Sequence, residues 1–184
     1  MTTVITNITA NCCLNREFDI DKLVEEHPYC YAIRNKKSEN KKFFSAKVDC
    51  IFASALLFKN GNTVFVGANS VDNVYLACDV LCSYFDIDKR PEVYFSNFCS
   101  TANYGQRLNN ESLYEFLRFQ KDTKSIIYER ELFPPIRLQT HLHTSTINIF
   151  DSGKLTSTGN RSRESAINSL ETTLKAISES GCVR

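Results

Sequence analysis

The chain has 184 residues, of which 42% are hydrophobic and 23% are charged, and its formal net charge is +1. This composition suffices for a packed core. No apolar run approaches the roughly 20 residues that span a bilayer. Because the net charge is close to zero, any basic surface must be local. The first residues lack the basic start and apolar block of a signal peptide. We therefore expect an intracellular protein whose eight cysteines are reduced thiols.

The first half of the chain is predicted to open with a strand and a short helix. Residues 3–13 carry apolar side chains without helical spacing, which is typical of a strand. Asp19 is a candidate N-cap for a short helix that ends at His27-Pro28. Further strands are expected at 29–33, 43–52, 54–58 and 63–66. Asn60-Gly61 is a typical turn for the hairpin between the last two.

A longer helix is predicted after Ser70, which is a candidate N-cap. Its apolar residues fall on one stripe at helical spacing, which indicates a single buried face. The stripe comprises Val71, Val74, Tyr75, Cys78, Leu81, Cys82 and Phe85.

A basic segment interrupts the first half at residues 34–42, RNKKSENKK, with five basic residues against one acidic residue. Such a run is typical of a solvated loop. It is also the kind of local patch that a nearly neutral nucleic-acid-binding protein needs, and both interpretations stay open.

The second half is predicted to repeat this order of elements. Strands are expected at 93–101, 125–128, 136–143, 146–150 and 154–158. A helix is expected over 110–120, a loop over 130–135, and a hairpin turn at Asp151-Ser152-Gly153. Ser162 is a candidate N-cap for the last helix, and the final five residues are expected to fray. The inward residues of that helix are Ala166, Ile167, Leu170, Leu174 and Ile177.

An internal repeat relates the two halves. Phe58, Gly61, Gly67 and Ser70 recur as Phe150, Gly153, Gly159 and Ser162, all 92 positions later. Asn7, Leu23 and Phe43 recur as Asn97, Leu113 and Phe133, 90 positions later. One unit built twice implies pseudo-two-fold symmetry, and duplex DNA is a natural two-fold partner. Because no Pro/Gly/Ser-rich linker intervenes, we expect repeats at 1–90 and 91–184 within one continuous domain.

Four helices cover only one face of a single antiparallel sheet, so strand alternation decides what the other face carries. The residues predicted to face the helices are Leu57, Phe65, Ile147, Ile149 and Leu155. The residues predicted to face away are Leu56, Phe58, Val64, Val66, Asn148, Phe150, Thr156 and Thr158. A large uncovered face with phenylalanines and small groups indicates a binding surface.

The sequence resembles the TATA-box-binding protein family. The resemblance rests on YERELFPP at 128–135, IFDSGKLTSTG at 149–159, LFKNGNTVFVGA at 57–68 and SNFCSTA at 96–102, in the family's order, and it extends over residues 4–180. It implies an α+β fold, a pseudo-two-fold saddle with one curved antiparallel sheet of about ten strands and four helices on the convex face.

The resemblance also implies a mode of DNA binding. In that family the sheet lies on the minor groove, and two pairs of phenylalanines wedge into base steps and kink the duplex. The pairs carried over are Phe43 with Phe58 and Phe133 with Phe150. The residues implied to contact DNA are Asn7, Thr9, Phe43, Leu56, Phe58, Val64, Val66, Asn97, Cys99, Phe133, Phe150, Lys154, Thr156, Thr158 and Arg161. Glu129 and Glu131 match an acidic stirrup that contacts transcription factor IIB in the family.

Several positions depart from the family's pattern. Asn62 and Asn69 stand where the first repeat of the family has lysines, and Gln139 replaces a phosphate-binding arginine. The other departures are Val66 for a threonine, Asn148 for a leucine and Thr156 for a valine. Fewer cations predict weaker binding to DNA, and a more polar second half-site predicts a shifted base preference.

Metal-binding and catalytic signals are weak. His141 and His143 fall on one face of a predicted strand. They could be plain surface residues, contacts to the phosphate edge, or two ligands of a metal site, but no third ligand is recognisable. No CxxC occurs, so Cys12, Cys13, Cys78 and Cys82 suit buried thiols better than zinc ligands. No cofactor, nucleophile-base arrangement or phosphate-cradling glycine loop is indicated.

These patterns predict a non-enzymatic general transcription initiation factor. It is expected to bind and bend A/T-rich promoter DNA and to recruit IIB-like and IIA-like factors and RNA polymerase. The expected location is the nucleus, or a cytoplasmic viral transcription site for a viral protein. One alternative is a related interaction scaffold with weak or no DNA binding. Another is part of a DNA-repair glycosylase, although no catalytic lysine-aspartate helical domain is recognisable.

Overall fold

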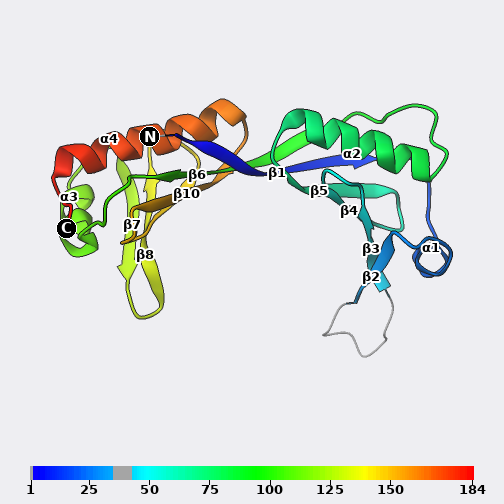
Figure 1. Cartoon of the computed structure of the whole chain (residues 1–184), viewed down its shortest axis with the longest axis horizontal. Helices are drawn as coiled ribbons and strands as arrows, with labels where there is room; N and C mark the ends of the chain where they lie inside the picture. Colours follow the sequence, from blue (N-terminus) through cyan, green and yellow to red (C-terminus); the bar gives the residue numbers. More distant parts are fainter. Residues whose placement is uncertain (1, 35–42) are drawn as a thin grey trace. The chain divides into compact units, whose positions relative to one another are not determined.

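The computed structural model describes residues 2–34 and 43–184, apart from the side chains of residues 34, 43 and 44. Most of the predicted basic patch, at 35–42, therefore lies outside the described residues. The described chain forms ten strands in one open antiparallel sheet and four helices, the expected α+β class (Figure 1). It divides into two compact units, Asn7–Ser96, called the first half below, and Met1–Thr6 with Asn97–Arg184, called the second half.

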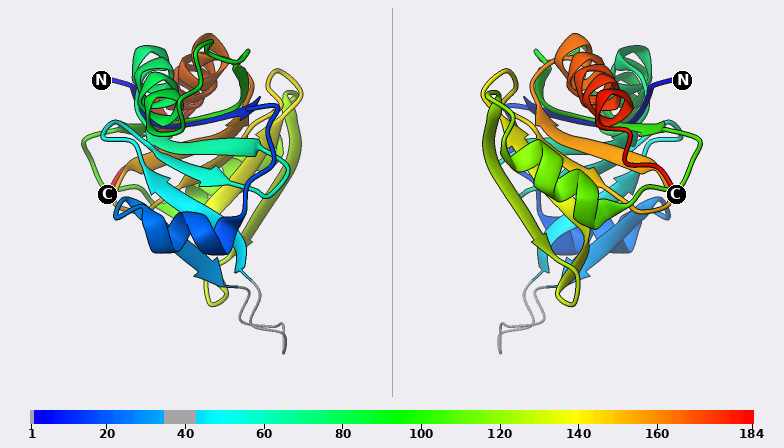
Figure 2. Two further views of the ribbon diagram at one scale, coloured as in Figure 1. Left: turned by 90° about the vertical axis from the view of Figure 1, so that its right-hand side faces the viewer. Right: turned by 90° about the vertical axis from the view of Figure 1, so that its left-hand side faces the viewer.

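The first half has the strand order β2-β3-β4-β5-β1. Its elements are β1 (Val4–Cys13), α1 (Ile20–Glu26), β2 (Cys30–Arg34), β3 (Phe43–Asp49), β4 (Ser54–Leu57), β5 (Asn62–Ala68) and α2 (Val71–Tyr84). Helix α1 packs on β2 and β3, and α2 packs on β4 and β5 (Figure 2, left). All pairings within it are antiparallel.

The second half has the matching order β6-β10-β9-β8-β7. Its elements are β6 (Tyr94–Asn103), α3 (Asn110–Arg118), β7 (Thr123–Glu129), β8 (Phe133–Thr140), β9 (Thr146–Ile149), β10 (Lys154–Asn160) and α4 (Arg163–Ser180). Helix α3 packs on β7 and β8, and α4 packs on β10 (Figure 2, right).

Side-chain caps begin all four described helices. Asp19, Ser70 and Ser162 each accept a hydrogen bond from the backbone N–H three residues on, which confirms the predicted N-caps. Asn109 caps α3 in the same way, without a matching prediction from the sequence. None of the described helices has the length and apolar character needed to cross a bilayer.

The predicted strand alternation is confirmed. The five residues predicted to face the helices, Leu57, Phe65, Ile147, Ile149 and Leu155, are fully buried. Those predicted to face away are half-buried or, for Thr158, exposed. The uncovered side of the strands, called the open face below, is therefore the side that the sequence predicts.

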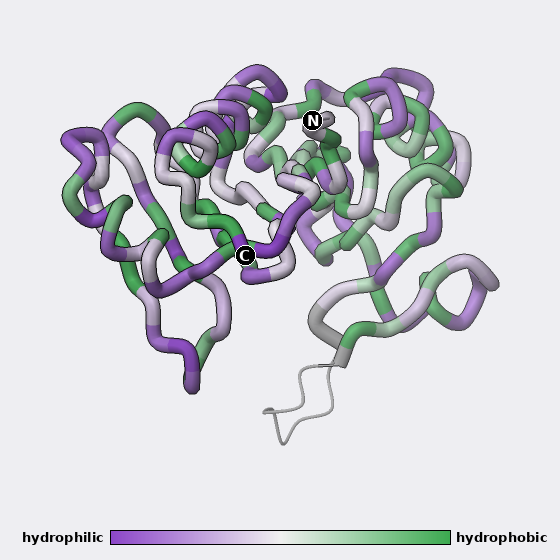
Figure 3. Tube along the Cα trace, turned by 60° about the vertical axis from the view of Figure 1, so that its left-hand side comes forward, coloured by the Kyte–Doolittle hydropathy of each residue, from purple (hydrophilic) through white to green (hydrophobic). Residues whose placement is uncertain are grey.

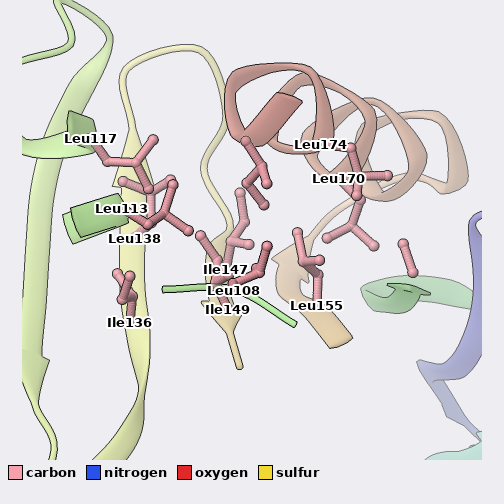
Figure 4. Packing of buried hydrophobic residues seen from close by; sticks show 12 residues of the cluster. Leu108, Leu113, Leu117, Ile136, Leu138, Ile147, Ile149, Leu155, Leu170 and Leu174 are labelled. Carbon is pink, nitrogen blue, oxygen red and sulfur yellow. The ribbon is translucent and has the colours of Figure 1, made fainter. Parts of the chain in front are cut away.

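The core of the second half is built from leucines and isoleucines. Leu113 and Leu117 of α3 and Leu170 and Leu174 of α4 meet the inward residues of β8, β9 and β10 (Figure 4). Leu108, which precedes α3, is also fully buried in this cluster. The two helices thus cover one side of the half-sheet and leave the other side uncovered.

Strand β8 corrects two predictions from the sequence. It begins at Phe133 and ends at Thr140, whereas the predicted loop extended to residue 135 and the predicted strand to residue 143. A tight turn pairs Glu129 with Phe133, so the prolines that follow lie at the start of the strand, where a missing N–H is tolerated. His141 and His143 therefore follow the strand and do not share a strand face.

The C-terminal tail is not frayed, contrary to the prediction. Gly181 ends α4 in the left-handed conformation, with φ of 64°. Val183 pairs with Leu108 in an isolated β-bridge. The Arg184 N–H donates to Arg107 O at 2.9 Å. These contacts are distant in the sequence, so local composition does not reveal them.

Candidate nucleic-acid interface

A row of four side chains crosses the open face of the first half. Strand pairing aligns Lys47 on β3 with Leu56 on β4, Leu56 with Val64 on β5, and Val64 with Asn11 on β1. The centre of this row is apolar, and both central residues are half-buried. Leu56 and Val64 were both predicted to contact DNA, and the strand register places them next to each other.

The corresponding row of the second half is polar throughout. Strand pairing aligns Arg137 on β8 with Asn148 on β9, Asn148 with Thr156 on β10, and Thr156 with Thr101 on β6. Asn148 Nδ2 donates to Thr156 Oγ1 at 3.3 Å. Asn148 Oδ1 is shielded from solvent and has no hydrogen-bond partner. The two polar residues that replace the family's leucine and valine, Asn148 and Thr156, therefore form a hydrogen-bonded pair.

The next row along the strands differs in the same direction. In the first half Ser54 lies opposite Val66, and in the second half Thr146 lies opposite Thr158. Gln139 Nε2 donates to Thr146 Oγ1 at 2.9 Å, so this glutamine is engaged on the open face. At the four central positions of these rows the first half has three apolar side chains and Ser54, whereas the second half has a hydroxyl or amide group at all four.

The predicted wedge phenylalanines lie at matching places. Phe58 follows β4 and Phe150 follows β9, and both are half-buried. Each begins a hairpin turn, with Gly61 N–H bonded to Phe58 O at 2.9 Å and Gly153 N–H bonded to Phe150 O at 3.0 Å. The same turn therefore positions the ring in each half.

The other two predicted wedge residues, Phe43 and Phe133, are the first residues of β3 and β8. Phe133 opens β8, is 38% exposed, and has the Arg137 guanidinium carbon 4.8 Å from its ring centre. Phe43 opens β3, but its side chain lies outside the description. Contact with the guanidinium orients the Phe133 ring on the open face.

Two asparagines bond to the glycines of equivalent bulges in β5 and β10. Gly67 N–H donates to Asn7 Oδ1 at 2.6 Å, and Gly159 N–H donates to Asn97 Oδ1 at 2.8 Å. The glycines have φ of 93° and 87°, a region that favours glycine, and the strand register shifts beside them. Each bond occupies the carboxamide oxygen, so the NH2 group is the part directed to other acceptors. Asn97 Nδ2 also donates to Cys99 Sγ at 3.3 Å.

Lys47 and Arg137 are candidate site residues that the sequence prediction missed. They are 90 positions apart and occupy the same place in the two rows. Lys47 Nζ lies 2.9 Å from Asp49 Oδ1, and this ammonium holds the pKa of Asp49 below its usual value. The signal was available in the sequence, because both residues share the repeat offset and the strand parity of the predicted open-face set.

The remaining predicted contact residues keep to the open face or its margin. Lys154 is exposed at the start of β10, and Arg161 is exposed just before α4. Thr9 on β1 and Cys99 on β6 are partly exposed. Their alternation with buried neighbours places all but Arg161 on the open-face side of their strands.

An acidic hairpin tip joins β7 to β8. Glu129 and Glu131 are both exposed, and Leu132 beside them is 81% exposed. Arg130, the basic residue between the two glutamates, forms an ion pair with α3, because its Nη1 lies 3.5 Å from Glu111 Oε1. The tip is strongly hydrophilic in Figure 3. Leu132 is a candidate contact residue that the sequence prediction did not single out.

The thiols are buried or partly buried and unpaired. Burial raises the pKa of Cys50 and of Cys82 to about 12. The hydrogen bond to Cys12 and burial raise the pKa of Cys78, and that bond lowers the pKa of Cys12. Within residues 2–34 and 43–184, no cluster of three or more His, Cys, Asp or Glu side chains is placed to hold a metal.

The described chain is thus a duplicated half-sheet with an uncovered face, with Phe58 and Phe150 on matching turns and Asn7 and Asn97 bonded to matching glycines. The family model for transcription factor TFIID, or TATA-binding protein, matches residues 2–86 and 92–180. The chain belongs to this family of general transcription factors, which act with DNA and the transcription machinery and are not enzymes.

Named relatives support the same assignment. The chain is 27% identical to TATA-box-binding protein 2 of Haloferax volcanii, over 96% of this chain and 94% of the relative. It is 24% identical to TATA-box-binding protein 3 of Methanosarcina acetivorans, over 89% of this chain and 88% of the relative. The solved structure of Methanococcus jannaschii TBP has the same fold, with a TM-score of 0.71 and 21% identity over 97% of this chain and 99% of that one. These relatives are archaeal and give no support to the expected nuclear or viral setting.

Proposed function

We propose that this protein is an initiation factor that binds promoter DNA through the minor groove and bends it. The observation that carries the proposal is one half-site built twice, with Phe58 and Phe150 on the same turn of each half-sheet. Membership of the family supports it, because the family's members act with promoter DNA. An uncovered face with matched rings suits a duplex whose two strands are themselves related by a two-fold axis.

The chemistry of the open face suits the minor groove. A·T pairs present only acceptors there, which the NH2 groups of Asn7 and Asn97 complement. Phenylalanine rings inserted between base steps kink the duplex, and the wider contact with bent DNA offsets an unstacking cost of a few kcal/mol per step. Within the described part of the chain, Lys47, Arg137 and Lys154 lie on this face and supply cations for phosphates. A/T-rich sequence is the expected preference, because TA steps deform easily.

Bending provides the direct test. Dyes at the two ends of an A/T-rich duplex should approach each other when the protein binds. Phe58→Ala and Phe150→Ala should each weaken binding about tenfold or more, because a lost wedge leaves the unstacking cost uncompensated. Leu76→Ala is the matched control, since Leu76 is a large side chain 45% exposed on helix α2. Tight binding with an unchanged end-to-end distance would exclude the wedge mechanism.

Recruitment of a IIB-like factor is assigned to the acidic hairpin tip. Glu129 and Glu131 repel phosphate, so they suit a basic protein surface bound beside the DNA. Exposed Leu132 adds an apolar anchor to the same contact. Such a partner should slow dissociation of the protein from DNA, and Glu129→Arg with Glu131→Arg should abolish that effect. Equal stabilisation of the double variant would move the docking site elsewhere. IIA-like factors and RNA polymerase are proposed further partners.

A second function, an interaction scaffold with weak DNA binding of its own, is favoured by the charges of the open face. Lys47 is paired with Asp49, and Gln139 is neutral. Binding to the duplex measured at low and at physiological salt separates the two functions. The scaffold function predicts at most weak binding at low salt and no binding at physiological salt in the absence of a partner protein.

A further inference from the structure

We infer that the second half-site accepts a G·C base pair, through the carboxamide of Asn148 held by Thr156, whereas the first half-site rejects one. The inference rests on the proposed function and adds a specificity and a direction to it. A bound site would then be asymmetric, with A·T pairs at one end and a G·C pair allowed at the other. That asymmetry would fix the orientation in which the protein lies on a promoter.

The internal repeat provides the comparison. Leu56 pairs with Val64 across β4 and β5, and Asn148 pairs with Thr156 across β9 and β10, at the same register in the two halves. Both pairs lie on the open face and are half-buried. The strand pairing at this point is thus the same, and the two central side chains differ in chemistry.

The minor groove makes that chemistry selective. A·T and T·A pairs present acceptors alone, and a G·C pair adds the N2 amino group of guanine, which is a donor. Against Leu56 and Val64 this donor would be buried without an acceptor, which is unfavourable because a buried donor needs a partner. An apolar pair at this place therefore excludes guanine.

Asn148 supplies the missing acceptor. Its Nδ2 donates to Thr156 Oγ1 at 3.3 Å, so Thr156 occupies the donor side of the carboxamide. Its Oδ1 has no hydrogen-bond partner and is shielded from water. A buried carbonyl without a donor is a rare arrangement, and this one belongs to an open-face side chain, where a bound base can supply the donor. The guanine amino group is a donor that satisfies it after a small rotation of the side chain towards the groove.

The neighbours of this pair support the same ligand. Arg137 lies directly opposite Asn148 on β8 and is a cation available to the backbone of the strand being read. Gln139 is bonded to Thr146 at 2.9 Å, so it does not compete for Asn148. Thr156 retains a hydroxyl hydrogen that can be donated to a base acceptor of the same pair.

The experiment uses four duplexes of equal length, with a G·C pair in neither half, in either half, or in both halves. A single substitution should be tolerated at either end, because the protein can bind in the orientation that places guanine against Asn148. Substitution in both halves should weaken binding by about tenfold, the cost typical of one mismatched pair. Competition titrations at fixed salt give these ratios.

Two double variants exchange the chemistry of the half-sites. Asn148→Leu with Thr156→Val should lose about tenfold on the singly substituted duplexes while keeping its affinity for the A/T duplex. Leu56→Asn with Val64→Thr should regain about tenfold on the doubly substituted duplex. Thermal melting of each variant shows whether it is folded.

Asn148→Asp separates readout from structure. A carboxylate only accepts hydrogen bonds, so this variant should bind more weakly overall but shift its ratio of affinities towards guanine. A merely structural role for Asn148 would leave that ratio unchanged.

Two results would overturn the inference alone. If wild type rejects a single G·C pair at either end, the carboxamide presents its NH2 group to the groove and the assignment is wrong, although minor-groove binding stands. If the double variant at Asn148 and Thr156 keeps the wild-type ratios, other residues set the base preference. Absence of binding to every duplex would overturn the proposed function together with the inference.

Discussion

The two halves of this molecule reach the same fold with different interiors. Beneath α2 the first half buries the ring of Phe65, which strand pairing places between Ala10 and Ala55. Beneath α4 the second half buries hydrogen-bonded polar groups. The equivalent pairs are Phe65 with Ser157, Ala68 with Asn160, Ala77 with Ser169 and Leu81 with Thr173. All eight of these residues are buried.

The polar layer of the second half is internally satisfied. The hydroxyls of Ser157 and Ser169 lie 2.8 Å apart, and Asn160 Nδ2 donates to Ser157 Oγ and to Phe98 O. Ser100 Oγ donates to Ala166 O at 2.6 Å. A fully bonded polar layer substitutes for apolar filling without leaving a buried group unpaired. The fold therefore depends on caps, turns and alternation, which both halves share, more than on the identity of the filling.

The largest expected difference between the halves is the cost in stability of removing equivalent core side chains. Phe65→Ala removes a fully buried ring and should lower the free energy of unfolding by about 3–5 kcal/mol. Ser157→Ala, at the equivalent position, removes one hydroxyl and should cost about 1–2 kcal/mol. Denaturant unfolding of both variants measures the two values, and similar losses would show that the halves are not filled by different means.

The second prediction isolates the polar layer. Asn160→Ala installs the residue that the first half has at this position, yet it leaves Phe98 O and Ser157 without their donor. It should lower the free energy of unfolding by about 1–3 kcal/mol. Adding Ser157→Ala and Ser169→Ala should recover part of the loss, because fewer polar groups then remain unpaired. Strictly additive losses in the triple variant would argue against a coupled layer.

A third prediction compares Lys47 and Arg137, the open-face cations at equivalent positions of the two halves. Arg137→Gln should reduce the slope of log K against log salt by about 0.9 and weaken binding to DNA severalfold. Lys47→Gln should have a smaller effect, because Asp49 already pairs with that ammonium at 2.9 Å. Arg137→Gln with Gln139→Arg moves the cation two residues along the same face of β8 and should restore the slope. Equal slopes for wild type and Arg137→Gln would place this side chain away from phosphate.

The smallest expected effect concerns the thiols, which also differ between the halves. Cys12, Cys30, Cys50, Cys78 and Cys82 are buried, and all five lie in the first half. Burial raises the pKa of Cys30 to about 11 and of Cys82 to about 12, so thiolate is scarce at pH 8. A chromogenic disulfide reagent should label Cys13, Cys99 and Cys182 of the native protein quickly and the buried five only on unfolding. Fast labelling of all eight would show that the first half opens readily.

Much of the fold could be predicted because its signals are local. Asp19, Ser70 and Ser162 cap helices through bonds to residues three positions on, so their neighbours in sequence suffice. Strand parity separates Phe65 from Val64 and Val66, because successive side chains point to opposite faces. The repeat offset then transfers each prediction from one half to the other.

The sequence by itself determined the duplicated unit, its helix caps and hairpin turns, and which side chains line the open face. Tertiary structure alone decided the strand register, which aligns Arg137, Asn148 and Thr156 in one row. It also decided that β8 begins at Phe133 and that Val183 pairs with Leu108. The physical reason is that periodicity and capping act within a few residues, whereas pairing between strands and the unpartnered oxygen of Asn148 depend on segments that meet only in the folded chain.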